Sequence, residues 1–194
     1  YQPYLYRDNG CKPYPAVDAA GDVSGGLKPS GSPEGDCLSS IGQIYSRAGW
    51  SGSQYGIMYA WYMPKDEPMP GIGHRHDWEC SVVWLDNPSA AEPKIIGLSA
   101  SAHGGFSTIK DDFSSHFDGD HGFIEYISYW PLDHQMAITK TEGVFQPLIA
   151  YESLTYAARY TLENWDFGDA NVPFKDSNFD NNLSEAWSAD SSAI

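Results

Sequence analysis

The stretch Gly73-His74-Arg75-His76-Asp77-Trp78-Glu79 organises the interpretation of this sequence, and Pro64-Lys65-Asp66 precedes it closely. A strand over residues 75–85 would place alternate side chains on opposite faces. Asp77 and Glu79 would then share one face with Arg75, and Trp78, Cys80 and Val82 would share the other. This alternation predicts a strand with one charged face and one buried face.

The charged face of this strand is a candidate binding site. Within the fourteen residues 66–79, two imidazoles and three of the four carboxylates are the candidates: Asp66, His74, His76, Asp77 and Glu79. At about 4 Å and an effective dielectric of about 20, two carboxylates repel by on the order of 4 kcal/mol, which a cation, a proton or water must relieve. Carboxylate oxygens suit hard cations such as calcium, magnesium or manganese, and a neutral imidazole can complete the shell.

Spacing alone leaves two interpretations of this cluster open. The first is a divalent-cation site. The second is the polar face of an edge strand, in which the histidines are hydrogen-bonded within the fold. In either case Arg75, on the same face, is an internal candidate for relieving the repulsion between the two carboxylates.

The composition favours one β-rich domain over residues 1–194. With 194 residues, of which 41% are hydrophobic, the chain is long enough for one well-filled core and short for two domains. Thirteen prolines, nineteen glycines and 14% aromatic residues favour strands joined by many turns, with helices as accessory elements.

The charge of the chain limits its partners. A formal net charge of −15 leaves no basic stripe to displace counterions from nucleic acid, so we expect no nucleic-acid partner. The same charge opposes binding to anionic phospholipid, so membrane contact would need neutral sugar, an ion bridge or inserted apolar side chains. The sequence lacks a long apolar run and begins at Tyr1 without a signal-like segment, which we interpret as a mature form.

The three cysteines divide into a pair and a single residue. Cys11 and Cys37 flank a loop rich in glycine, proline and serine, whereas Cys80 lies in an apolar run. We expect a disulfide between Cys11 and Cys37, which would stabilise a loop-rich fold by roughly 3 to 4 kcal/mol. Cys80 is expected to be a buried thiol that packs as a small hydrophobic residue.

Alternating and β-branched patterns predict most of the sheet. The expected strands are residues 55–63, 75–85, 94–102, 123–129, 135–139 and 145–151, with a short edge strand near residues 4–7. Pro64 is expected to end the first long strand, because proline cannot continue a ladder of hydrogen bonds. A loop over residues 65–73 would then bring Asp66 back beside Asp77 and Glu79.

Helical spacing predicts two helices and a final turn. The first helix is expected over residues 38–48, on the spacing of Leu38, Ile41, Ile44, Tyr45 and Ala48. The second is expected over residues 154–164, with Ser153 as its N-cap and with a buried stripe of Leu154, Ala157, Ala158 and Leu162. The tail from residue 166 is acidic and rich in asparagine and serine. Ser184 is a candidate cap for one or two last turns, and we assign the tail no chemistry.

Three features outside the heptad are further candidates. His103, in the turn His103-Gly104-Gly105, could face the site or be a hydrogen-bonded turn residue. The acidic stretch over residues 111–121 lacks the order of an EF-hand loop and is interpreted as solvated. Trp130 precedes a proline at a strand end, which favours an exposed loop tip, although tryptophan more often lies in the core.

The heptad and the segment Tyr59-Ala60-Trp61-Tyr62-Met63-Pro64-Lys65-Asp66 together resemble the signature of the necrosis- and ethylene-inducing-peptide-like proteins, the NLP toxins of plant-associated microbes. Other segments follow the family order up to about residue 165. They are Gly10-Cys11 through Gly25-Gly26-Leu27-Lys28-Pro29, Ser101-Ala102-His103-Gly104-Gly105, Trp130-Pro131-Leu132-Asp133-His134 and Gln146-Pro147-Leu148-Ile149-Ala150.

The resemblance implies a fold and an activity. The fold is a single-domain β-sandwich, similar to actinoporins and lectins, with a few flanking α-helices. The activity is that of a secreted, monomeric and non-enzymatic cytolysin that damages the plasma membrane of a host plant. It would bind glycosylinositol phosphorylceramide head groups beside a calcium or magnesium ion, and a plant immune receptor would detect it.

The resemblance also implies roles for single residues. Asp66, His74, Asp77 and Glu79 look like the metal-site residues of the family. The residues that look like supporting groups around the pocket are Arg75, His76, His103 and His134. Trp130 resembles the loop aromatic that contacts the membrane.

Two alternatives remain open beside the lytic toxin. One is a weakly lytic or non-lytic secreted member of the family, because residues 55–79 resemble the family peptide that plants detect and detection needs no lysis. The other is a metal-dependent enzyme that acts on plant wall polymer. The heptad is not a His-Glu-x-x-His motif, and three carboxylates fit poorly to an iron site with two histidines and one carboxylate. The sequence also has no Gly-x-Ser-x-Gly elbow.

Overall fold

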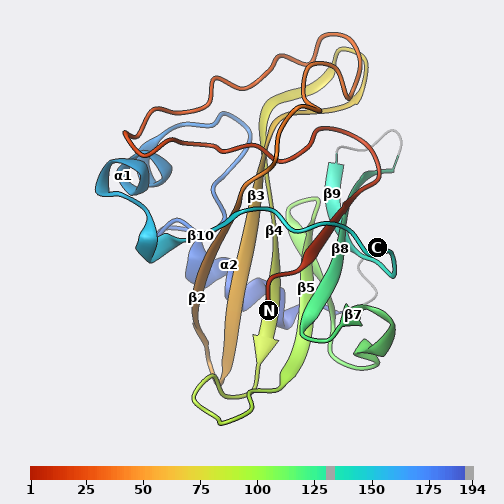
Figure 1. Cartoon of the computed structure of the whole chain (residues 1–194), viewed down its shortest axis with the longest axis vertical. Helices are drawn as coiled ribbons and strands as arrows, with labels where there is room; N and C mark the ends of the chain where they lie inside the picture. The colour runs from red at the N-terminus through yellow and green to blue at the C-terminus, as the bar shows by residue number, and fades with distance from the viewer. Residues whose placement is uncertain (130–133, 191–194) are drawn as a thin grey trace.

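Two β-sheets face one another, and two helices cover the outer side of the larger sheet (Figure 1). The structure is a computed structural model that describes residues 1–129 and 134–190. Its strands are β1 (Tyr4–Arg7), β2 (Ile44–Ser51), β3 (Gln54–Met69), β4 (Ile72–Leu85), β5 (Ile95–Ala102), β6 (Gly105–Ile109), β7 (Phe117–Asp118), β8 (His121–Ser128), β9 (His134–Ile138) and β10 (Leu148–Ala150). The helices are α1 (Tyr156–Asn164) and α2 (Phe179–Ser188), with short 3-10 turns at Phe113–Ser115 and Tyr151–Ser153.

The larger sheet has six strands in the order β10-β2-β3-β4-β5-β6. All of its neighbours are antiparallel except β10 and β2, which are parallel. In the smaller sheet β8 pairs in parallel with β1 and antiparallel with β7 and β9. The long β3–β4 hairpin is the central feature of the larger sheet, since it pairs from Tyr55 opposite Leu85 up to Met69 opposite Ile72.

Side chains of β3 alternate between the two faces of the larger sheet, and both faces are buried at this strand. One set packs between the two sheets and includes Tyr59, Trp61 and Met63. The other set packs under the helices and includes Met58, Ala60 and Tyr62. The expectation of a mainly β sandwich with a few flanking helices is confirmed.

The predicted helix over residues 38–48 is wrong, because the second half of this segment is β2. Ile44 and Tyr45 are both buried, but on opposite faces of the sheet: Ile44 packs between the sheets and Tyr45 packs under the helices. Ile41 is 85% exposed, so the helical spacing did not mark a buried face. Apolar residues on both faces of a strand hide the period-two pattern and produce an accidental helical one.

Pro64 does not end β3, and the predicted loop over residues 65–73 is instead the upper part of the hairpin. The pairing of β2 with β3 reaches only Ala60, so position 64 needs no N–H donor toward β2. The Pro64 carbonyl accepts a hydrogen bond of 2.7 Å from the backbone N–H of Leu27, which lies in a loop. The turn itself is confined to residues 70–71.

Residues 11–37, which we call the N-terminal strap, cross over the upper half of the hairpin (Figure 1). The disulfide between Cys11 and Cys37 closes the strap, as expected, and both residues are buried. Tyr14 pairs with Tyr62 in an isolated bridge, and the Leu27 bond to Pro64 lies further along β3. The strap therefore takes the place of a neighbouring strand where β2 has ended. Cys80 is a free, buried thiol, as expected, and burial raises its pKa.

The two helices differ in detail from the predictions. Thr155, and not Ser153, is the N-cap of α1, because the Thr155 side chain accepts a hydrogen bond from the backbone N–H of Ala158. Helix α2 begins five residues before Ser184 and buries Phe179, Leu183 and Ala186. Within residues 1–129 and 134–190, no helix is long and apolar enough to cross a membrane.

Replacing Thr155 with alanine is expected to lower the free energy of unfolding by about 1 kcal/mol, because the cap bond to Ala158 N, 3.1 Å long, is lost. The Thr155 hydroxyl also donates to the Ala19 carbonyl at 2.8 Å, which joins α1 to the strap. Urea denaturation measures the change, and Ser153→Ala is the matched control, with an expected change below about 0.5 kcal/mol. The reverse ranking of the two variants would contradict this cap assignment.

Candidate functional site

The upper end of the β3–β4 hairpin carries the predicted metal-site residues in register. Asp66 pairs across the strands with His74, Met63 with Asp77, and Trp61 with Glu79. Because Trp61 and Met63 point into the core between the sheets, Asp77 and Glu79 lie directly beside that core. Asp66 and Asp77 are only 1% and 6% exposed, so the site begins where the apolar core ends.

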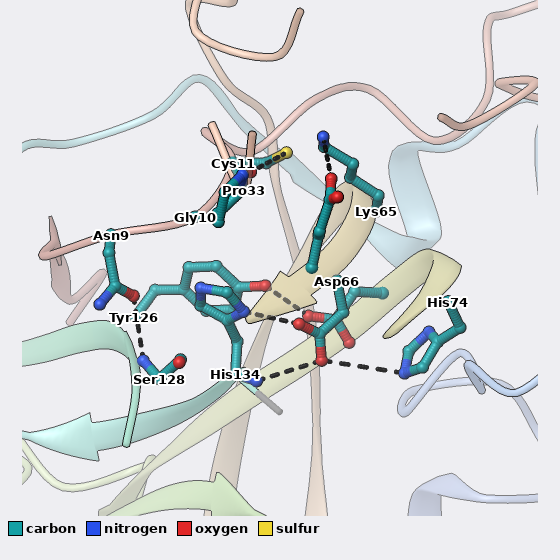
Figure 2. Close-up of polar contacts among 12 residues, drawn as sticks. Asn9, Gly10, Cys11, Pro33, Lys65, Asp66, His74, Tyr126, Ser128 and His134 are labelled. Carbon is teal, nitrogen blue, oxygen red and sulfur yellow. Dashed lines mark hydrogen bonds and ion pairs between the residues drawn. The ribbon is translucent and has the colours of Figure 1, made fainter. Parts of the chain in front are cut away.

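Asp66 is held by His134, which the smaller sheet supplies from β9. The His134 ring places Nδ1 2.6 Å from Asp66 Oδ1, and the His134 backbone N–H donates to Asp66 Oδ2 at 3.1 Å. The His134 ring stacks on Tyr126, with centroids 4.7 Å apart. Figure 2 shows Asp66 between His134 on one side and His74 on the other. The contact therefore joins the larger sheet to the smaller one through buried hydrogen bonds.

His74 has the orientation of a histidine that can bind a cation. Its Nδ1 lies 2.8 Å from the backbone carbonyl of His76, and since a carbonyl only accepts, Nδ1 carries the proton. In a neutral ring the lone pair would then be on Nε2, which lies 3.8 Å from Asp66 Oδ2. Metal-binding histidines commonly donate the other ring N–H to a carbonyl in this way.

Asp77 and Glu79 are carboxylates in an environment that disfavours their charge. Burial, followed by the negative charge of Asp66, raises the pKa of Asp77 to about 7, although the Tyr126 hydroxyl donates to Asp77 Oδ2 at 2.7 Å. Burial, followed by the charge of Asp77, raises the pKa of Glu79 well above its usual value, although the Ser101 hydroxyl donates to Glu79 Oε2. A divalent cation would relieve this repulsion.

The residues present fit a hard divalent cation in part. Carboxylate oxygens and one imidazole are suitable ligands for calcium or magnesium. Among the described residues, however, no three His, Cys, Asp or Glu side chains are arranged to enclose an ion unaided. Water or the oxygens of a bound ligand would therefore have to complete the shell, since calcium takes about six to eight oxygen ligands.

A pocket of about 740 Å³ opens beside these carboxylates. Its near wall is formed by β4, its rim by the turn after β5, and its far wall by residues of the C-terminal segment. The near wall and rim include Asp66, His74, Asp77, Glu79, Ser101, His103 and His134. Within the part of the chain that the structure describes, no lysine or arginine lines the pocket, so its potential is negative.

The far wall is the part of the site that sequence reasoning missed, because the tail was assigned no chemistry. Its polar members are Asp169, Asn171, Asn178, Asn182 and Glu185. Asn178 and Asn182 donate to the carbonyls of Val172 and Pro173 at 3.0 and 2.8 Å and so hold the preceding loop on α2. The spacing of four and three residues along α2 was a usable signal, since it puts Asn178, Asn182 and Glu185 on one stripe.

Arg75 and His76 lie away from the pocket, so the expectation that Arg75 faces Asp77 and Glu79 is wrong. Arg75 Nη1 donates to the strap carbonyls of Gly25 and Gly26. His76 has a φ of 63°, a left-handed conformation that interrupts the strict alternation of the strand. Its Nδ1 lies 2.6 Å from the Tyr62 hydroxyl, and burial, followed by the charge of Arg75, lowers its pKa.

His103 and Trp130 were the other two candidate site residues, and the structure describes only the first of them. His103 lies at the pocket rim, in a turn where its φ is 47°. The predicted membrane contact, Trp130, lies outside the described residues, so its role stays a prediction.

The fold and the site together define a class: a mainly β sandwich protein with an acidic, ligand-sized pocket at one end of its longest hairpin. The chain belongs to the necrosis inducing protein (NPP1) family, whose family model matches residues 1–186. NLP effector protein 10 of Phytophthora capsici is 49% identical over 189 residues, which cover 96% of this chain and 81% of that protein.

Solved structures show the same fold. The structure of NLPPya in complex with mannosamine is 53% identical, with a TM-score of 0.90, and the match covers 96% of this chain and 86% of that one. The structure of the non-toxic HaNLP3 protein is 41% identical, with a TM-score of 0.92, and covers 96% of this chain and 88% of that one. This chain is thus similar both to a protein with a bound amino sugar and to a protein described as non-toxic.

Proposed function

We propose that this chain is a secreted toxin that binds a divalent cation, calcium or magnesium, together with the sugar head group of a plant sphingolipid, and then damages the plasma membrane. The observation that carries the proposal is the set of neighbouring carboxylates Asp66, Asp77 and Glu79, placed at the wall of an acidic pocket. Asp66, His74, Asp77 and Glu79 would hold the cation, some directly and others through water. When bound, the cation would neutralise the carboxylates and accept sugar hydroxyls as ligands.

The supporting residues have separate tasks in this proposal. His134 and Tyr126 hold Asp66 and Asp77 from the smaller sheet, at 2.6 and 2.7 Å. Ser101 holds Glu79, and His103 at the pocket rim would meet the ligand. These contacts keep the carboxylates oriented before any cation binds, which lowers the cost of binding.

The lining of the pocket and a relative support the proposed ligand class. Carboxylates and amides without lysine or arginine in the described lining suit a partner that carries hydroxyl or ammonium groups. NLPPya, of 53% identity, has been solved with mannosamine bound, which supports an amino sugar here. The specific target, glycosylinositol phosphorylceramide, and detection by a plant immune receptor are proposed from the family resemblance.

Membrane contact is proposed to run through the sugar and Trp130. The net charge of −15 opposes direct attraction to anionic phospholipid, so the head group must supply the specificity. An indole can rest at the lipid head-group level, with its ring in apolar surroundings and its N–H among polar groups. We propose no enzymatic step and no catalytic residue for this activity.

Leakage from vesicles tests the proposal. Vesicles that contain plant glycosylinositol phosphorylceramide are expected to leak on addition of the protein with calcium or magnesium. Matched vesicles without that lipid, or a chelator with the lipid present, are expected to prevent leakage. Equal leakage from both kinds of vesicle would exclude head-group recognition, and full leakage in chelator would exclude the cation.

Trp130→Ala is expected to reduce this leakage while leaving the melting temperature nearly unchanged. The reason is the sequence Trp130-Pro131 at a strand end, which favours a loop position for the indole. Differential scanning calorimetry provides the control, because truncating a core tryptophan typically costs about 3 to 5 kcal/mol. A large fall in melting temperature would place Trp130 in the core and remove this role.

A weakly lytic or non-lytic member of the family is the second candidate. The similarity to the non-toxic HaNLP3 protein supports it, because a TM-score of 0.92 means that this fold also occurs in a protein described as non-toxic. The same vesicle experiment separates the candidates: cation and sugar binding without leakage would favour the second.

A further inference from the structure

Asp66 lies between two residues of opposite charge that form a buried ion pair. Lys65 Nζ contacts Glu67 Oε2 directly, and the two residues are only 4% and 1% exposed. Neighbouring side chains on a strand point to opposite faces, so the pair lies behind Asp66. Figure 2 shows Lys65 pointing away from His134 and His74.

The hydrogen bonds of this pair join three segments of the chain. Glu67 Oε1 accepts from the backbone N–H of Gly71, in the hairpin turn, at 2.9 Å, and from that of Gly31, in the strap, at 3.1 Å. Lys65 Nζ donates to the strap carbonyl of Ser32 at 2.8 Å. Each charge is therefore bonded both to its partner and to backbone groups, which is the geometry that a buried pair requires.

The backbone at Asp66 needs such support because the ladder becomes irregular there. The register between β3 and β4 shifts between Asp66 and Met69. Gly73 packs so closely that a Cβ there would lie 2.2 Å from the Asp66 carbonyl oxygen, and its φ is 120°. Regular strand pairing thus does not hold this end of the hairpin by itself. A binding constellation, in contrast, must be held to within about 0.5 Å of its productive geometry.

We propose that Lys65 and Glu67 are positioning residues for Asp66, and that the strap, through residues 31 and 32, holds the cation-binding end of the hairpin in its binding geometry. This inference rests on the proposed cation site. The ion pair acts from behind, while His134 acts on the carboxylate itself from the front. A buried pair is weak support for stability in general, so its use here is to fix one conformation.

The experiment compares the calcium affinity of variants by calorimetry at a temperature where each is folded. Lys65→Met removes one charge, and Glu67→Gln removes the other while keeping an oxygen that can accept from Gly31 and Gly71. Both are expected to weaken binding about tenfold, in the range seen when groups that orient metal ligands are removed. Glu34→Gln is the matched control, because it breaks another ion pair of the strap, Arg7 Nη1 to Glu34 Oε1 at 2.6 Å, and should leave affinity unchanged.

Repeating Lys65→Met and Glu67→Gln in an Asp66→Asn background distinguishes positioning from a general loss of structure. If the pair acts through Asp66, each added change should alter calcium affinity less than about twofold in that background. An equal tenfold loss in both backgrounds, or unchanged affinity in the single variants, would overturn the inference. If the wild-type protein binds no calcium or magnesium, the proposed function itself fails, and that result is separate from the first two.

Discussion

Replacing Asp77 with asparagine is expected to weaken calcium or magnesium binding at least about tenfold, because the site loses one of its neighbouring carboxylate charges. The same change should not destabilise the cation-free protein. Burial and the charge of Asp66 already raise the pKa of Asp77 to about 7, and a neutral amide relieves that conflict. Its oxygen can still accept the hydrogen bond that Tyr126 now donates to Asp77 at 2.7 Å.

Calorimetric titration measures the affinity, with Asp118→Asn in the acidic stretch of residues 111–121 as the matched control. Undiminished binding by the Asp77 variant together with weaker binding by the Asp118 variant would move the cation site to that stretch.

The pH dependence gives a second measurement on the same variant. The folded-state pKa of Asp77, about 7, lies above the unfolded value of about 3.9, so the folded state binds the proton more tightly. Its contribution to stability in chelator is therefore full below about pH 4 and is lost as the pH rises toward about 7. Urea denaturation across this window should show a smaller decline for Asp77→Asn than for the wild type.

Removing the disulfide, with serine at both Cys11 and Cys37, is expected to lower the free energy of unfolding by about 3 to 4 kcal/mol. The two cysteines are 26 residues apart, and opening a loop of that size gives the unfolded chain this much conformational freedom on the chain-entropy estimate. Both positions are buried, at 1% and 0% exposure, so two hydroxyls in an apolar site add to the loss.

Urea denaturation with and without reductant measures the effect. Cys80→Ala, which leaves the disulfide intact, is the control, and reductant should lower its stability to the same extent as that of the wild type. A loss below about 1 kcal/mol in the double variant would mean that the strap is held by its contacts with the hairpin and not by chain closure.

Local patterns predicted the lower part of the hairpin and the carboxylates of the near wall, but not the upper part of the hairpin, where a loop over residues 65–73 was expected. Asp77 and Glu79 alternate with Trp78 and Cys80 along one strand, and the structure places the second pair in the core under the helices. The same alternation did not extend through His76, whose left-handed conformation turns Arg75 toward the strap. The pattern of a strand cannot reveal this interruption, because the conformation of His76 accompanies contacts between Arg75 and backbone carbonyls of the strap.

Sequence patterns did not predict the secondary structure of a strand that packs against other elements on both of its faces. Ile44 and Tyr45, at the start of β2, are buried on opposite faces of the sheet, so the alternation of polar and apolar residues is hidden there. The far wall of the pocket was not predicted for a different reason. Asn182 and Glu185 belong to α2, about one hundred residues after the heptad, and only the packing of α2 on the outer side of the sheet brings them to the pocket. Their spacing indicates one stripe of a helix, but it does not indicate which surface of the fold that stripe meets.

The two sides of the site lie far apart in the sequence, and this separation affects the order in which its contacts form during folding. The β3–β4 hairpin closes by a short turn, so its pairing is local and should form early. Asp66 and His134 are 68 residues apart, and Asp77 and Tyr126 are 49 apart. Such contacts require the closure of long loops, which slows their formation. In a refolding experiment, calcium-binding competence should therefore appear later than the tryptophan fluorescence of the hairpin.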